Sequence, residues 1–350
     1  MFFKKIMIKK QKIRIKNINI GIELLRMIFC FLIVVYHLHS NEKKSYIMNL
    51  SLCCLGFYTS TFFLISFYFS FRCLTSNNII ILKERLRRII LPYVIWPIII
   101  FLEKNIIKYK YSNKFPYSIK HLILQLVVGR NINDVFWFQF NLIFISIIII
   151  IISLIFQKNI SFYIFICIFL FAVYFNFKGF DKAIFSSYNK NISHSVGRIS
   201  YSIIYSITGF LLGSFNLLNL IKDKHKKIIL LFFPFLLYIL REHNKIILIT
   251  PKFYFIIIDI IIIFLFIFFS SIHLDSVMNI NFIMIIKRIT SFTGGVYYLH
   301  LFIFDIFYSF TDLIRKRDAK SCIIIYFLCY LICFIFSNIF KQSRLKYLFI

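Results

Sequence analysis

Three ionisable side chains stand in an apolar stretch near the N-terminus, and their spacing puts them on one side of a helix. Glu23, Arg26 and His37 lie within residues 19–39, a run long enough to cross a bilayer. Glu23 and Arg26 are three residues apart, which is pairing distance on a helix. Arg26 and His37 share one face, about 16 Å apart, because eleven residues make three turns plus about 20°. Charges at membrane depth cost about 2.5–3.5 kcal/mol on insertion scales, so such groups usually face the protein interior.

This polar face has two interpretations. In the first, Arg26 extends toward the headgroups with Glu23 as its partner, and His37 is an interfacial histidine. In the second, the three side chains do chemistry, because an imidazole exchanges protons near neutral pH and a guanidinium stabilises developing negative charge. His39 points about 200° away from His37 and needs no role.

A second basic group lies in KERLRRIILPYVIW, residues 83–96. Arg85, Arg87 and Arg88 stand where a predicted span leaves the cytoplasm, and Pro92 is expected to kink that span. Forked guanidinium donors match phosphate oxygens, so the cluster suits a polyanion. Ordinary positive-inside anchoring and attraction to anionic lipid headgroups are the alternatives.

Further candidates are scattered along the chain. Trp137 stands at interfacial depth in its predicted span, where anchoring in an aromatic belt is the default role. Arg198 is interpreted as a rim charge, and Asp259 and Asp305 are candidate buried charges. His300 lies in the middle of TGGVYYLHLFIFD, which begins next to paired glycines that allow close helix approach.

The composition is that of a membrane protein. Hydrophobic residues make up 60% of the chain, and it contains 47 Phe, more than a soluble globule of this length carries. We expect an all-α integral membrane protein, a bundle of about ten transmembrane helices without a soluble domain. The net charge of +29 does not indicate nucleic acid binding, since the lysines are dispersed and no nucleic-acid motif is visible. The eight cysteines show neither zinc spacing nor a disulfide framework, so no metal is predicted.

The chain divides into three predicted parts. Residues 1–18 form a basic cytoplasmic segment, residues 19–340 a transmembrane domain and residues 341–350 a short cytoplasmic tail. The first span is expected to be a retained anchor. With an even number of spans both termini are cytoplasmic, and the Lys and Arg bias between loops supports this orientation weakly. The nine further spans are expected at about 50–71, 88–102, 135–156, 160–177, 196–217, 228–240, 250–271, 289–311 and 321–340.

Five stretches, taken in order, resemble the acyltransferase-3 family of multi-pass membrane enzymes. IELLRMIFCFLIVVYHLHS resembles the family's first span, in which a His follows an Arg by eleven residues. The other four are FFLISFYFSF, similar to its second-span FFxISGF, the Arg-rich ERLRRIILPYVIW, FWFQFNLIF and GGVYYLHLFI, similar to its GxYLxH span.

This resemblance implies transfer of an acyl group, most often acetyl, from cytoplasmic acyl-coenzyme A to a hydroxyl of a surface carbohydrate or lipid-linked sugar. His37 would be the general base or acyl relay, and Arg26, held by Glu23, would stabilise the thioester oxygen or position the donor. The arginine cluster would bind coenzyme phosphates. Trp137, Tyr298 and His300 are candidate substrate-binding residues. The enzyme would reside in the cell membrane, surrounded by lipid.

Two other functions compete with this interpretation. A transporter or flippase of polysaccharide intermediates would use Arg26 and His37 to line a polar path without covalent chemistry. A scaffolding member of the family is the second alternative, because Met27 and Ile28 replace small residues after the first-span arginine and Phe67 replaces the second-span glycine.

Overall fold

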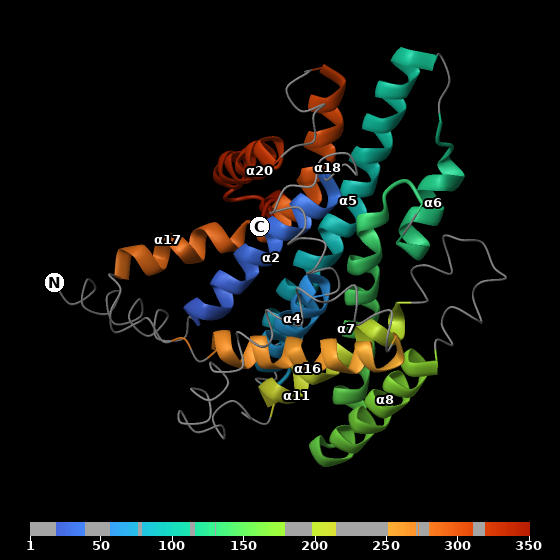
Figure 1. The fold of residues 1–350 in the computed structure, drawn as a ribbon, viewed down its shortest axis with the longest axis vertical. Helices are drawn as coiled ribbons and strands as arrows, with labels where there is room; N and C mark the ends of the chain where they lie inside the picture. Colours follow the sequence, from blue (N-terminus) through green and yellow to red (C-terminus); the bar gives the residue numbers. More distant parts are fainter. Residues whose placement is uncertain are drawn as a thin grey trace.

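The computed structural model describes residues 19–38, 57–75, 79–112, 116–129, 131–178, 198–214, 251–270, 272, 280–310 and 319–350. These residues form helices and contain no strand (Figure 1). The α-helices are α2 (Ile20–Leu38), α4 (Phe57–Thr75), α5 (Ile79–Ser112), α6 (Ile119–Val128), α7 (Trp137–Ile155), α8 (Lys158–Lys178), α11 (Ile199–Ser214), α16 (Pro251–Ser270), α17 (Ile280–Ser291), α18 (Thr293–Phe310) and α20 (Ala319–Ile339), with short 3₁₀ turns η1 (Asp134–Phe136) and η2 (Arg344–Leu348).

Five of the described helices contain segments long and apolar enough to cross a membrane: Ile20–Leu38, Lys83–Ile107, Trp137–Ile155, Asn159–Asn176 and Lys320–Ile339. They indicate an all-α membrane protein, as predicted. The bundle of about ten spans is not confirmed, because the predicted runs in α4, α11, α16 and α18 are not among these five. The predicted segments 1–18 and 228–240 and the side chain of Asp259 lie outside the described residues.

Two predicted spans have other boundaries in the structure. The run at 88–102 is part of α5, whose 34 residues extend for about 51 Å. This exceeds the roughly 30 Å of a hydrocarbon core, and Figure 1 shows the end of α5 projecting beyond its neighbours. The run at 289–311 is interrupted at Phe292, where α17 ends and α18 begins.

Helix α2 contributes to both large cores of the molecule. Phe29 and Ile33 pack into a core with α4, α7, α11 and α16, whereas Val34 and Leu38 pack into a second core with α5, α18 and α20. The first turn of α2 is fixed by Asn19, whose side chain accepts the Ile22 N–H at 3.1 Å and donates to the Ser270 carbonyl at 2.6 Å. The polar residues of α2 are therefore held between the two cores.

Helix α5 is held from two sides by hydrogen bonds from its buried face. Tyr93 donates to the carbonyl of Leu126 at 2.7 Å, which ties α5 to α6, and Trp96 donates through Nε1 to the carbonyl of Leu348 at 3.1 Å. The residues 341–350, predicted to be a short tail, pack on α5 and α20 through η2, and Phe349 is buried. This terminal segment thus helps to fix where the basic first half of α5 lies.

Candidate functional site

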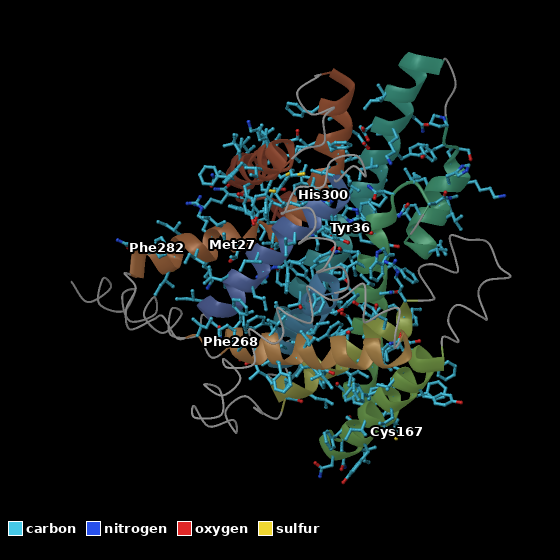
Figure 2. The ribbon with its side chains drawn as sticks, in the orientation of Figure 1. Met27, Tyr36, Cys167, Phe268, Phe282 and His300 are labelled. Carbon is cyan, nitrogen blue, oxygen red and sulfur yellow. The ribbon has the colours of Figure 1, made fainter. Side chains whose placement is uncertain are left out.

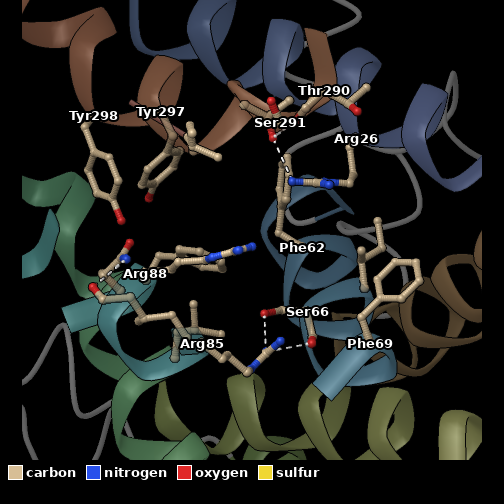
Figure 3. A pocket seen from close by; sticks show the side chains of 18 of the residues that line it. Arg26, Phe62, Ser66, Phe69, Arg85, Arg88, Thr290, Ser291, Tyr297 and Tyr298 are labelled. Atoms are coloured by element: carbon tan, nitrogen blue, oxygen red, sulfur yellow. Dashed lines mark hydrogen bonds between the residues drawn. The ribbon is translucent and has the colours of Figure 1, made fainter. Parts of the chain in front are cut away.

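A cavity of about 540 Å³ is lined by α2, α4, α5, α7, the α17–α18 junction and Ile350 (Figure 3). Four cationic side chains line it, whereas the acidic side chains on its wall are Glu23 and Glu84. The remaining walls are largely apolar and aromatic. The excess of basic groups makes this cavity suitable for an anion. The four cationic residues are Arg26, Arg85, Arg88 and Lys287.

Arg26 is held at two points beside the cavity. Its Nη1 lies 3.0 Å from Oε2 of Glu23, which confirms the pairing that the spacing predicts. Its Nη2 donates to Oγ1 of Thr293 at 3.0 Å, and that hydroxyl in turn donates to the Thr290 carbonyl at 2.9 Å. Helices α2, α17 and α18 together therefore fix the orientation of the guanidinium.

The three clustered arginines of α5 do not share one environment. Arg85 donates through Nη2 to the carbonyl and hydroxyl oxygens of Ser66 at 2.8 and 3.1 Å. The Arg88 guanidinium lies 5.5 Å above the Tyr347 ring. Arg85 and Arg88 line the cavity because residues three apart share a helix face. Arg87 does not line it; this side chain pairs with Glu84 at 3.3 Å and is 34% exposed.

The predicted base His37 lies one helical turn beyond the cavity. Ile33, which stands four residues earlier on the same face of α2, lines the cavity wall. The centroid of the His37 ring is 5.3 Å from that of His300 on α18. The His300 ring is also 6.1 Å from Tyr297, another lining residue. In Figure 2, His300 is seen close to Tyr36, the neighbour of His37. Arg26 thus lines the cavity, whereas His37 does not.

The two remaining predicted substrate contacts differ in position. Tyr298 lines the cavity, with its ring stacked between Trp96 at 6.3 Å and Phe136 at 5.9 Å. Trp137 is buried and does not line the cavity. The Arg198 guanidinium lies 4.4 Å from the centre of the Trp137 ring, so this ring makes a cation–π contact within the protein.

Several cavity residues were not singled out from the sequence. Lys287 lies just before the span predicted at 289–311, in the stretch INFIMIIKRITS that forms the amphipathic helix α17 with a basic last turn. Glu84 accepts a hydrogen bond from the Tyr347 hydroxyl, which raises the pKa of Tyr347. Nothing in the sequence pattern indicates that contact, because the two residues are 263 positions apart.

The described geometry defines a helical membrane protein with a cationic cavity and a neighbouring histidine pair. No protein-family model matches the chain, and no curated protein or solved structure shows significant similarity to it. The resemblance to the acyltransferase-3 family therefore stays a prediction.

Proposed function

We propose that this protein is a membrane O-acyltransferase. It transfers an acyl group, acetyl in the first instance, from cytoplasmic acyl-coenzyme A to a hydroxyl of a surface polysaccharide or lipid-linked sugar. The observation that carries this proposal is the convergence of four cationic side chains from α2, α5 and α17 on one cavity. Its setting is the cell membrane, with both termini in the cytoplasm. A polyphosphate group such as that of coenzyme A satisfies such a cluster through charge-assisted hydrogen bonds.

Each cation has a role in holding the donor. Arg85 and Arg88 bind coenzyme phosphates, and Lys287 of α17 adds a point charge to the cavity lining. Arg26 lies in this cavity, about 16 Å along α2 from His37. Its position favours donor binding over stabilisation of the thioester oxygen. The pantetheine arm of the donor then extends past Tyr297 toward the histidines.

The transfer itself uses His37 as a general base. The imidazole takes the proton of the acceptor hydroxyl while that oxygen attacks the thioester carbonyl. The carbon–sulfur bond breaks, and the leaving coenzyme A thiolate takes the proton from the imidazolium. The products are an ester and free coenzyme A thiol, so atoms and charges balance without a metal or redox partner.

Mass spectrometry of surface glycans and lipid-linked sugars tests this proposal. The samples come from cells with the wild-type protein, a deletion, His37→Ala and Arg26→Ala. Loss of one acyl mass in all three altered strains is expected, and that mass identifies the acyl group. Arg87→Ala is the matched control, because this arginine does not line the cavity, and it should keep the acyl mass.

A transporter or flippase of polysaccharide intermediates is the second candidate, and the same cavity favours it. Its cationic and aromatic walls also suit the phosphate and isoprenoid parts of a lipid-linked sugar. Unchanged acylation together with accumulated intermediates in the deletion strain would support transport and contradict the acyltransferase proposal.

A further inference from the structure

One ring nitrogen of His300 is buried without a hydrogen-bond partner among the residues that the structure describes. The side chain is fully buried, and its Nδ1 lies 3.2 Å from the carbonyl oxygen of Val296. A carbonyl only accepts hydrogen bonds, so Nδ1 carries the proton of the neutral ring and Nε2 is an acceptor. Nε2 is buried and has no hydrogen-bond partner among the described residues. A buried polar atom without a hydrogen bond lowers the free energy of unfolding, so its presence here needs an explanation.

The ring of His37 is placed to supply the missing donor. Its centroid is 5.3 Å from that of His300, and the two ring planes are inclined by 37°. A direct N–H···N bond of about 3 Å would place two imidazole centroids roughly 5 Å apart. The observed separation of 5.3 Å matches the separation that such a bond requires. Hydrogen bonds of catalytic groups are often looser in ligand-free structures and tighten in the complex.

We propose that His300 is a positioning residue for His37. Nε2 of His300 accepts the N–H of His37, so that His37 presents its unprotonated nitrogen to the acceptor hydroxyl. The same bond holds the imidazolium that forms when His37 takes up the proton, as the orienting partner of a catalytic base does in other enzymes. The inference rests on the proposed function, because it assumes that His37 is the base.

Other ionisable groups pack around the two histidines. Tyr36 lies next to His37, with a ring separation of 5.2 Å, and Tyr297 lies 6.1 Å from His300. Helix α5 carries Glu103 and Lys104 further along, and Lys104 is 3.9 Å from Asp305 of α18. Helix α20 contributes thiols and tyrosine hydroxyls to the same core. Among these groups, the imidazole of His300 on α18 lies within 5.3 Å of the His37 ring.

Two substitutions separate positioning from packing. His300→Phe fills the site with an apolar ring and removes the orphan nitrogen, so a purely structural role predicts an unchanged or higher unfolding temperature and normal transfer. Positioning predicts an unchanged unfolding temperature with kcat lowered about 100-fold, an unchanged KM for acetyl-coenzyme A and a shifted acidic limb of the pH profile. His300→Gln, whose side-chain oxygen is an acceptor, should retain more activity than His300→Phe.

The assay follows radiolabelled acetyl transfer from acetyl-coenzyme A to the glycan fraction of host membranes by protein in lipid nanodiscs. His121→Gln is the matched control, since this histidine lies on α6 and contacts Ser118, far along the chain from both helices of the pair. Normal kcat and a normal pH profile for His300→Phe would overturn the proposal.

A second readout needs neither donor nor acceptor. Nitrogen-15 NMR of histidine-labelled protein in bilayers reports the tautomer of His37, which the His37→Asn spectrum assigns. We expect His300→Phe to change the tautomer ratio of His37, whereas an unchanged ratio refutes positioning. If the ratio changes but the wild-type protein transfers no acetyl group, the pairing stands and the acyltransferase function fails.

Discussion

The affinity for acetyl-coenzyme A should depend on Arg88 of α5 but not on Arg87, because only Arg88 lines the cavity. Arg88→Gln removes a cation from the cavity wall, and Arg87→Gln removes one about 100° further around the helix, which does not line the cavity. The two variants have the same change in net charge and the same helix propensity cost. The variants differ in the position of the lost guanidinium and in the partner it leaves, which is Glu84 for Arg87 and the Tyr347 ring for Arg88.

The expected magnitudes follow from the two environments. A hydrogen bond to a charged group contributes about 1.5–3 kcal/mol, so loss of Arg88 should weaken binding about 10-fold to 100-fold. Arg87 is 34% exposed and its partner Glu84 is 37% exposed. Exposed pairs contribute about 0–1 kcal/mol to stability, and Arg87 itself does not line the cavity, so Arg87→Gln should change the affinity no more than about 2-fold.

Equilibrium binding of radiolabelled acetyl-coenzyme A to nanodisc-embedded protein measures both effects. Repeating the titration at about 0.1 M and about 1 M salt adds a second test, because screening weakens phosphate contacts. The salt dependence should be smaller for Arg88→Gln than for the wild type or Arg87→Gln. Equal losses for the two variants, or none for Arg88→Gln, would contradict assignment of the cavity to a polyanion.

Three further predictions concern stability. A Cβ at residue 209 would overlap the Leu64 carbonyl, so Gly209→Ala should lower the free energy of unfolding by about 1–3 kcal/mol, and an unchanged unfolding temperature would contradict the close α4–α11 contact. Neither carboxylate oxygen of Glu103 has a hydrogen-bond partner among the described residues; Glu103→Gln should therefore stabilise by about 1 kcal/mol in a thermal-unfolding assay, and destabilisation would show that the charge is needed. Tyr347→Phe should cost about 0.5–1 kcal/mol by removing the bond to Glu84. Because that bond raises the pKa of Tyr347, its contribution is complete below about pH 10 and is lost as the pH rises through the raised pKa; a constant difference across this range would refute the assignment.

Local spacing was sufficient where the structure depends on one helix. The interval between Glu23 and Arg26 predicted their ion pair, whereas Arg87, which the sequence grouped with Arg85 and Arg88, does not line the cavity. Helix boundaries were less predictable, since α5 continues through the charged residues 103–104 that ended the apolar run. Contacts between distant helices, such as that of His37 with His300, leave no periodic signal because they depend on tertiary packing.

The order of contacts along three helices constrains how the chain crosses the membrane. Arg26 near the start of α2 contacts the first residue of α18, Thr293, and His37 near the end of α2 faces His300. These contacts advance in the same direction along both helices, so α2 and α18 run parallel. Helix α5 follows the same direction, because Trp96 stacks on Tyr298 and the later Lys104 approaches Asp305.

Parallel helices that both cross a bilayer must start from the same face. The chain then crosses an odd number of times between α2 and α18. The predicted arrangement satisfies this condition with seven runs in that interval, including 228–240 outside the described residues. A revised span count that removed a single crossing there would place the two starts on opposite faces, and Arg26 could not then contact Thr293. As long as α18 crosses the bilayer as predicted, any correction to the number of spans between α2 and α18 must therefore come in pairs.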